Sequence, residues 1–413
     1  MHEVHRLDKV VETVDEFDWT QFFRCRTIDY RGEEVKTAKS FGWANIGPAL
    51  PKEIGFVPLR DLCEKGCQFY VDHFPEFLKP PEEWPLLKKG RVMVSSDDWP
   101  EVACNLVRAG ICKVIPESEI FHVHGSPVLN GLFGVEKGEE CNGIPTYRLI
   151  MNLVPLNSIC LGLDADISSL PHWMGMNPFS LSPSEGLLIS SEDVRCFFYT
   201  LSLPACWLPF LAFNREAPGE LRPEGCHERC YLSSAVLPMG FLNSVGIAQH
   251  VHRILVQRSC PAPARDLASR EIRKDLPLPA SDCSWRVYLD NYDLLEKFPH
   301  EVIPDLEGTI AEEVKGLRGS YGIVGIPRHE GKSVSRKQAA EVQGAMVDGQ
   351  LGVAYPKGAK LIKYVVMSLF FCQLTACSQR QIQVICGGLV YFTTFRRQLL
   401  GSLNQCWKFI ESF

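Results

Sequence analysis

Two acidic residues stand where the chain can bring carboxylates together for metal chemistry. Asp290 follows the strand-like run Trp285–Leu289, so we predict a β-hairpin whose two-residue turn is Asp290-Asn291. Asp193 ends a second strand-like run and precedes the aromatic segment Phe197–Tyr199. A lone Asp at a strand end is ordinarily a helix N-cap. Two carboxylates from separate strands, however, can hold divalent cations for phosphoryl transfer.

Four further segments lie in a fixed order around these acids. Two precede Asp193 and contain a lysine or an arginine among apolar residues: Phe133–Lys137 and Tyr147–Asn152. One lies between the acids and reads Leu-Pro-Met-Gly-Phe-Leu-Asn-Ser over Leu237–Ser244. The last, Gly325–Ser333, is rich in glycine and basic residues. Its end resembles a P-loop, but its first glycine is one residue out of place and no strand-to-helix context is predicted, which excludes that motif.

Together these segments resemble the motifs of reverse transcriptases of the retroelement and retroviral type, over about Arg91 to Gly349. Tyr288–Asn291 resembles the Tyr-x-Asp-Asp hairpin of that family, and Leu237–Ser244 resembles its Leu-Pro-Gln-Gly-Phe-x-Asn-Ser motif. The resemblance implies an α+β fold, a right-hand polymerase with an antiparallel-sheet palm, fingers and a helical thumb.

The resemblance also implies roles for individual residues. Asp193 and Asp290 would bind two Mg²⁺ ions, with Mn²⁺ as a possible substitute, and Lys332 would act as a general acid. Phe198, five residues after Asp193, would exclude a 2′-hydroxyl and so select deoxynucleotides. The other residues expected to bind the nucleotide are Lys137, Arg148, Met239 and Gly240, the first two by neutralising the triphosphate. Without the pattern, Lys137 is equally well a surface lysine and Phe198 a core residue.

The chain departs from the family's pattern at three places. Asn291 replaces the second Asp of the hairpin, and an uncharged amide is a weaker cation ligand. Met239 replaces the usual Gln, which keeps apolar packing and loses a hydrogen bond. The loop between Lys137 and Arg148 is longer than in the retroviral enzymes, so the position of Lys137 is less firmly defined than that of Arg148.

The elements that must position these residues follow from periodicity and turn signals. We expect three regions: 1–90, an N-terminal extension without a chemical motif; 91–349, fingers and palm; and 350–413, a helical thumb-like segment. Strands are predicted at 132–135, 147–151, 186–193 and 210–213, with a polar loop at 136–145 and a Pro- and Ala-rich loop at 261–279. Helices are predicted at 242–257, 310–317 and 381–392.

Composition narrows the class of protein. The 413 residues are 46% hydrophobic, enough for a large core, and the net charge of −6 argues against a dedicated duplex binder. The last 63 residues nevertheless hold seven basic residues and one acid, which favours contact with a phosphate backbone or equally a solvated surface. The charged N-terminus lacks a signal peptide, and the run Tyr364–Cys372 is too short to span a bilayer. We therefore expect an intracellular protein, in the cytoplasm or nucleus, neither secreted nor membrane-bound.

Other metal sites are disfavoured by spacing. The 17 cysteines form no paired CxxC framework, which fits free thiols in a reducing compartment. Two pairs, Cys63 with Cys67 and Cys226 with Cys230, lack correctly spaced partners for zinc. His122 and His124 lack a third ligand, which favours a structural role.

The sequence thus predicts a retrotransposon-derived RNA-directed DNA polymerase that uses a DNA primer, an RNA or DNA template and deoxynucleoside triphosphates. A second hypothesis is a catalytically decayed transposon remnant that keeps a nucleic-acid-binding polymerase fold. A third is a polymerase that prefers a DNA template, or an RNA-dependent RNA polymerase, which Phe198 argues against.

Overall fold

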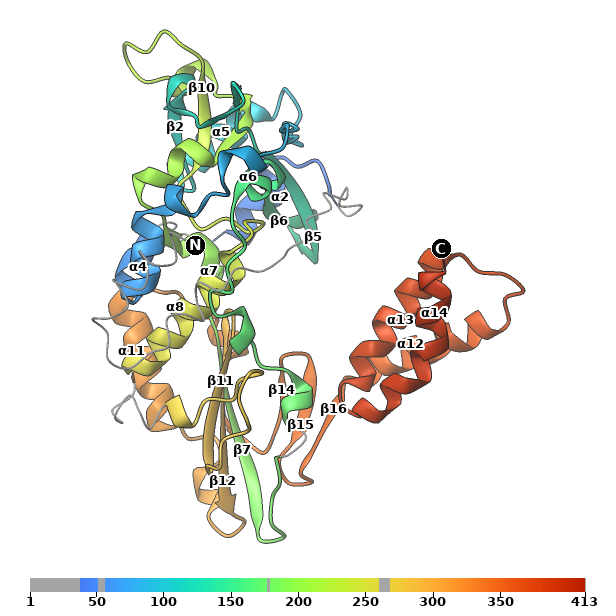
Figure 1. The fold of residues 1–413 in the computed structure, drawn as a ribbon. Helices are drawn as coiled ribbons and strands as arrows, with labels where there is room; N and C mark the ends of the chain where they lie inside the picture. The colour runs from blue at the N-terminus through green and yellow to red at the C-terminus, as the bar shows by residue number, and fades with distance from the viewer. Residues whose placement is uncertain (1–37, 51–55, 177–178, 260–267, 413) are drawn as a thin grey trace. The chain divides into compact units, whose positions relative to one another are not determined.

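A computed structural model describes residues 38–50, 56–176, 179–259 and 268–412 (Figure 1). The chain forms two compact units: a first unit of Met1–Ser168, Val194–Ser259 and Leu317–Arg328, and a second unit of Ser169–Asp193, Cys260–Gly316 and His329–Phe413. Helices and largely antiparallel sheets occur in both, which fits the predicted α+β class. The predicted boundaries at 90/91 and 349/350 stay predictions, and the loop at 261–279 lies partly outside the described residues.

The first unit combines short helices with small sheets. Its helices are α2 (Trp43–Ile46), α3 (Leu59–Leu62), α4 (Lys65–Asp72), α5 (Trp99–Arg108), α6 (Val154–Ile159), α7 (Phe197–Thr200) and α8 (Ser244–Ser259). Its strands are β1 (Val57–Pro58), β2 (Cys112–Pro116), β3 (His122–Val123), β4 (Ser126–Pro127), β5 (Gly131–Cys141), β6 (Ile144–Asn152), β8 (Leu201–Ser202), β9 (Ala212–Glu216) and β10 (Cys230–Ser234). The largest sheet has the order β2-β10-β9 and is antiparallel.

Aromatic side chains fill the core of the first unit. Trp207 stacks on Phe74 with ring centroids 3.9 Å apart, and Tyr70 and Phe241 meet it edge-on. The indole N–H of Trp207 donates to the carbonyl of Val71 at 2.8 Å, so the buried ring keeps its one polar group paired. This packing ties α4 to the segment that precedes α8.

The β5–β6 hairpin corrects one sequence prediction. Residues 136–145, predicted as a polar loop, belong largely to the two strands, which turn at Asn142-Gly143 with φ of 52° and 75°. Asn-Gly is a strong signal for a two-residue hairpin turn because both residues tolerate positive φ. A register shift between Glu136 and Glu140 absorbs the extra length.

The second unit is built around a four-stranded sheet. The strands of the unit as a whole are β7 (Glu185–Asp193), β11 (Cys283–Tyr288), β12 (Asn291–Pro299), β13 (Val334–Lys337), β14 (Ala339–Val342), β15 (Ala345–Asp348) and β16 (Val353–Pro356). Its helices are α10 (Ile303–Leu306), α12 (Gly358–Cys372), α13 (Gln379–Thr393) and α14 (Asn404–Glu411), while α11 (Glu312–Val324) ends in the first unit. The main sheet has the order β11-β12-β7-β13, and β14-β15-β16 form a separate antiparallel sheet.

The core of the second unit lies between these two sheets. Leu187 and Ile189 on β7 and Leu295 on β12 pack against Val342 and Val347 of the smaller sheet. Each is less than a tenth exposed, so the face they form is closed to water. This packing holds β7 and β12 rigidly at the centre of the main sheet.

All three predicted helices are present with shifted ends. Residues 242–257 and 381–392 fall almost entirely in α8 and α13, and α11 begins at Glu312 and runs beyond the predicted end at 317. Ser378 caps α13 by accepting a hydrogen bond from the backbone N–H of Gln381 at 3.3 Å. The strand predicted at 210–213 is confirmed in part: Ala212 and Phe213 begin β9, whereas Phe210 ends a 3₁₀ helix, Ala205–Phe210. Within the described residues no helix has the length and apolar character needed to cross a membrane.

Candidate active site

The strands β7, β11 and β12 run side by side and carry the acidic residues singled out above (Figure 1). Tyr288 and Asn291 form the last pair of the β11–β12 ladder, so the two turn residues are Leu289 and Asp290. The predicted turn, Asp290-Asn291, is therefore one residue out of register. Asn291 belongs to β12 because it also pairs with Asp193 on β7, which extends the ladder by one residue.

The tip of the hairpin is conformationally unusual. Leu289 has a φ of 56°, a left-handed conformation that glycine usually provides at the first central position of such a turn. A non-glycine residue held there costs on the order of 1–3 kcal/mol, and such residues cluster at functional sites. The surrounding ladders fix the turn and with it the position of Asp290.

Asp193 is the last residue of β7 and lies opposite Asn291. The ammonium of Lys332 lies 3.3 Å from its Oδ2, and the carboxylate is 14% exposed while the lysine is 60% exposed. The backbone carbonyl of Asp193 accepts a hydrogen bond from the N–H of His329 at 2.8 Å. Because α7 begins only at Phe197, after Cys196, the ordinary N-cap interpretation of Asp193 is wrong.

Asp290 is held by its neighbour. The Nδ2 of Asn291 donates to Oδ1 of Asp290 at 2.9 Å. The side chain of Asn291 thus orients the carboxylate of Asp290, while the backbone of Asn291 pairs with Asp193. The structure brings Asp193 together with Lys332 and pairs Asp193 with the first residue of the strand that begins after Asp290.

Two more buried acids, missed from the sequence, support this edge of the sheet. Glu192, 1% exposed, accepts a hydrogen bond from the hydroxyl of Ser333 at 2.6 Å. Asp293, fully buried, accepts from three donors: Ser191 Oγ at 2.8 Å, Arg286 Nε at 2.9 Å and Gln343 Nε2 at 2.7 Å. A buried carboxylate is tolerated when charge-assisted bonds replace its hydration. The signal in the sequence was their spacing: Glu192 directly precedes Asp193, and Asp293 lies three residues after Asp290.

The donor set at Asp193 and Asp290 fits a hard divalent cation. Asp193 ends β7, Asp290 is the turn residue just before β12, and neither is fully buried. Mg²⁺ commonly uses one or two protein carboxylates and keeps its other positions for water or substrate phosphate. Asn291 adds an amide oxygen in place of a third carboxylate, which lowers the negative charge that would hold the ions.

Phe198 lies on α7 in the first unit. Its neighbours Phe197 and Tyr199 are 1% and 4% exposed, whereas Phe198 is only partly buried. The Tyr199 hydroxyl donates to the carbonyl of Leu149, which ties α7 to β6, and burial raises the pKa of that phenol. Phe198 is thus the aromatic residue of this turn that keeps part of its surface accessible.

Lys137 and Arg148 lie on the β5–β6 hairpin of the first unit. Arg148 pairs with Val135 in the ladder and its side chain is exposed. Lys137 lies in the stretch where the register shifts, and its ammonium is 3.3 Å from Glu139. Arg148 thus has a regular ladder position and Lys137 does not, and the triphosphate-binding roles of both stay predictions.

Met239 and Gly240 form a tight loop before α8. The φ of Gly240 is 116°, and a Cβ there would lie 2.2 Å from the carbonyl oxygen of Met151. The carbonyl of Met239 accepts from the N–H of Met151 at 3.2 Å. Buried Asn243 fixes the loop by donating to Tyr70 and to the Leu161 carbonyl, at 3.1 Å and 3.0 Å. Gly240 is thus required by its positive φ and the close carbonyl of Met151, and Asn243 by its hydrogen bonds in the core.

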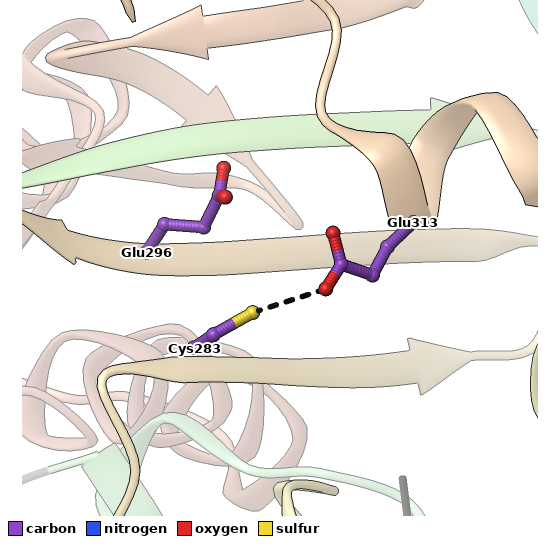
Figure 2. Close-up of side chains that lie close together, drawn as sticks. All are labelled: Cys283, Glu296 and Glu313. Atoms are coloured by element: carbon purple, nitrogen blue, oxygen red, sulfur yellow. Dashed lines mark hydrogen bonds between the residues drawn. The ribbon is translucent and has the colours of Figure 1, made fainter. Parts of the chain in front are cut away.

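A second cluster of metal-capable side chains escaped the sequence analysis. Cys283, Glu296 and Glu313 converge from β11, β12 and α11, with ligand atoms within 4.8 Å of one another (Figure 2). Glu296 is already paired with Arg336, which donates at 2.7 Å and 2.9 Å, and Glu313 lies 3.4 Å from Arg270.

Two acids and two arginines balance in charge at this cluster. Burial, with Glu313 nearby, raises the pKa of the Cys283 thiol to about 12, so the thiol stays protonated. A metal would have to displace two arginines and a proton. The cluster therefore serves as a polar network that joins α11 to the sheet.

The disfavoured metal and nucleotide motifs have structural roles. Sγ of Cys226 lies 3.4 Å from Sγ of Cys230, and no third metal ligand accompanies them among the described residues. The rings of His122 and His124 bond backbone carbonyls, at 2.7 Å and 3.0 Å. The segment ending at Ser333 runs from helix α11 to strand β13, the reverse of a P-loop.

Comparison with known proteins adds a likeness to solved structures. No protein-family model and no curated protein matches the chain. Among solved structures, a foamy viral protease-reverse transcriptase in complex with double-stranded DNA is similar, with a TM-score of 0.48 and 13% identity. The match covers 88% of this chain and 58% of that one, so the chain spans less than two thirds of that protein's length.

Proposed function

We propose that this chain is an RNA-directed DNA polymerase of retrotransposon origin that adds deoxynucleotides to a primer 3′-hydroxyl. The observation that carries the proposal is the end of the second-unit sheet, where Asp193 closes β7 opposite the residue that follows Asp290. Carboxylates at adjacent strand ends suit the divalent cations of phosphoryl transfer. The order of motifs along the chain supports the same conclusion.

In this proposal the sheet of β11, β12, β7 and β13 is the palm of a right-hand polymerase. The β5–β6 hairpin belongs to the fingers, and α12, α13 and α14 form the thumb. The basic surplus of residues 351–413 suits contact with the phosphate backbone of a template-primer.

The residues would divide the chemistry between binding, orientation and proton transfer. Held by Asp193 and Asp290, two Mg²⁺ ions, or Mn²⁺, would activate the primer hydroxyl and stabilise the leaving pyrophosphate. Nζ of Lys332 carries a proton that it can donate to a pyrophosphate oxygen. Arg148 and Lys137 would neutralise the triphosphate, Phe198 would exclude a 2′-hydroxyl, and Met239 and Gly240 would pack near the base pair.

Two observations favour a second candidate, a non-catalytic remnant that binds nucleic acid. Asn291 occupies a position where a carboxylate would strengthen cation binding, and Lys332 lies on the carboxylate of Asp193. A protein that no longer binds metal tolerates both arrangements without loss.

Primer extension separates the two candidates. The full chain is incubated with an RNA template, a labelled DNA primer and deoxynucleotides, in Mg²⁺ and separately in Mn²⁺. The proposal expects extension by the wild type and none by Asp290→Ala, with template-primer binding unchanged in a mobility-shift assay. Glu301→Ala, an exposed acid beyond the end of β12, is the matched control and keeps activity. Binding without extension in either metal would establish the remnant instead.

A further inference from the structure

Two cysteine thiols in the first unit lie close enough to react with one another. Sγ of Cys226 is 3.4 Å from Sγ of Cys230, whereas the sulfurs of a disulfide are about 2.0 Å apart. Both thiols also face the backbone carbonyl of Glu228, at 3.9 Å and 3.7 Å. The folded chain thus gathers the two sulfurs at one point of the loop that leads into β10.

The two thiols differ in their exposure to solvent. Cys226 is partly exposed and lies between the exposed residues Gly225 and His227, so a small oxidant can reach it. Cys230 is the first residue of β10, pairs with Pro116 on β2 and is 1% exposed. Burial raises the pKa of the Cys230 thiol to about 11, and the neighbouring Cys226 thiol adds to the rise. Cys226 is therefore the thiol that meets an oxidant first, and Cys230 is shielded from direct attack.

The segment between the two cysteines is attached to a 3₁₀ helix, Glu117–Glu119, that follows β2. The carboxylate of Glu228 accepts hydrogen bonds from the backbone N–H and the hydroxyl of Ser118, at 2.9 Å and 2.8 Å. Arg229 donates two hydrogen bonds to the carboxylate of Glu117, at 2.8 Å and 2.7 Å. These bonds hold the segment in place, so the two thiols meet without the entropy cost of ordering a loop.

We propose that Cys226 and Cys230 are a site of reversible oxidation, in which peroxide oxidises Cys226 and Cys230 converts the product to a disulfide. The thiolate of Cys226 attacks one peroxide oxygen, the O–O bond breaks, and hydroxide leaves and takes up the thiol proton, so that Cys226 becomes a sulfenic acid. The sulfur of Cys230 then attacks the sulfur of Cys226, the S–O bond breaks, and hydroxide leaves as water with the proton of Cys230. Two thiols and one peroxide thus give one disulfide and two waters.

The bond closes a short ring of the chain that contains Glu228 and Arg229. Oxidation therefore constrains the two residues that attach this loop to the 3₁₀ helix after β2. Excess small-molecule thiol opens the bond again by exchange, which makes the modification reversible. The pair shares no residue with the proposed polymerase site, so the inference does not rest on polymerase activity.

Peptide mapping of the full chain tests the proposal. The reduced protein is treated with hydrogen peroxide, its remaining thiols are blocked with iodoacetamide, and it is then unfolded and digested with trypsin without a reductant. Trypsin cuts after Arg229 and not before Pro223, so peptides 216–229 and 230–253 each contain one of the two cysteines. We expect mass spectrometry to find these two peptides joined after peroxide treatment and separate after dithiothreitol. Peptides that stay unlinked, or a Cys226 that links to other cysteines as often as to Cys230, would overturn the proposal.

Two serine variants test the order of the steps. In Cys230→Ser the sulfenic acid at Cys226 should accumulate, and dimedone should label Cys226 severalfold more than in the wild type. In Cys226→Ser the buried Cys230 should stay reduced, while exposed Cys141 serves in every variant as the control for reaction with peroxide. Because the linked peptides are mapped in the wild type, the test stands even where Cys230→Ser fails to fold. Equal labelling of Cys226 in the wild type and in folded Cys230→Ser, or oxidation of Cys230 in folded Cys226→Ser, would contradict the assigned roles.

Discussion

Asn291 lies directly opposite Asp193 in the β12–β7 ladder, and its side-chain amide donates to Asp290 at 2.9 Å. An uncharged side chain therefore stands at the one ladder position that adjoins both acids. A carboxylate there would add negative charge where divalent cations are expected to bind, and the amide instead orders Asp290. This relationship makes position 291 the most informative site for mutation.

Asn291→Asp should raise the rate of primer extension about tenfold, equivalent to ~1.4 kcal/mol of barrier. The added carboxylate should also make Mg²⁺ raise the melting temperature more than in the wild type, because the ions would relieve repulsion among three acids. Steady-state kinetics and thermal unfolding with and without Mg²⁺ measure the two effects. Asn291→Ala, which adds no charge, is the control. A lower rate for the Asp variant would show that the site is adapted to asparagine.

Lys332→Met should lower kcat by about 10²-fold or more, since a general acid contributes roughly this much. Lys332→Arg should retain part of the rate as a fixed positive charge without the proton-transfer step. Lys337→Met, at an exposed position on β13, is the matched control. A rate for Lys332→Arg equal to that of the wild type would assign Lys332 to positioning Asp193 only.

Phe198→Ala should relax discrimination against ribonucleotides while deoxynucleotide incorporation continues, because the side chain is partly accessible and the flanking aromatics form the core. The ratio of kcat/KM values for dATP and ATP on one template measures the change. Phe198→Tyr keeps the ring and should keep the discrimination. If the ratio stays the same in the Ala variant, Phe198 packs only against protein.

The Cys283 thiol should resist alkylation in the folded protein. Its raised pKa of about 12 leaves little thiolate at pH 8, whereas exposed Cys141 should react readily. Iodoacetamide labelling followed by peptide mass spectrometry compares the two, with urea-unfolded protein as the reference. Equal labelling of both cysteines in the folded protein would contradict the buried network of Cys283 with Glu313.

The same thiol contributes to the pH dependence of stability. Unfolded cysteines ionise near pH 8.5, while the folded thiol stays neutral to about pH 12. Its contribution to the free energy of unfolding is therefore fully present below about pH 8.5 and is lost as the pH rises toward 12. Urea unfolding of wild type and Cys283→Ser across this window should show a smaller loss in the variant.

The sequence identified the hairpin, β7 and the loop before β13 because each carries a strong local signal. Apolar runs, a short turn and glycine clusters are set by neighbouring residues. The hairpin turn was misplaced by one residue because the pairing of Asn291 with Asp193 is non-local, and no local pattern encodes it. The Asn142-Gly143 turn was in the sequence, but the polar residues around it favoured a loop.

The supporting side chains of the site were beyond local reasoning for the same physical reason. Asp293 reads as one more charged residue in a strand until Ser191, Arg286 and Gln343 are seen to converge on it. Glu192 likewise depends on Ser333 from a distant loop. Burial of a carboxylate is a property of the assembled sheet, so only tertiary structure reveals it.

The sheet that carries Asp193 and Asp290 joins strands that lie far apart in the sequence as well as strands that follow one another. The β11–β12 hairpin closes over a two-residue turn, whereas the bond from Ser191 to Asp293 links residues 102 positions apart. Closing a loop of that length is slow relative to hairpin formation. During synthesis and refolding, β7 therefore stays unpaired until β12 is available. Until then its apolar run Leu187–Ile189 is an open strand edge. Chains that end before residue 283 should therefore aggregate rather than fold.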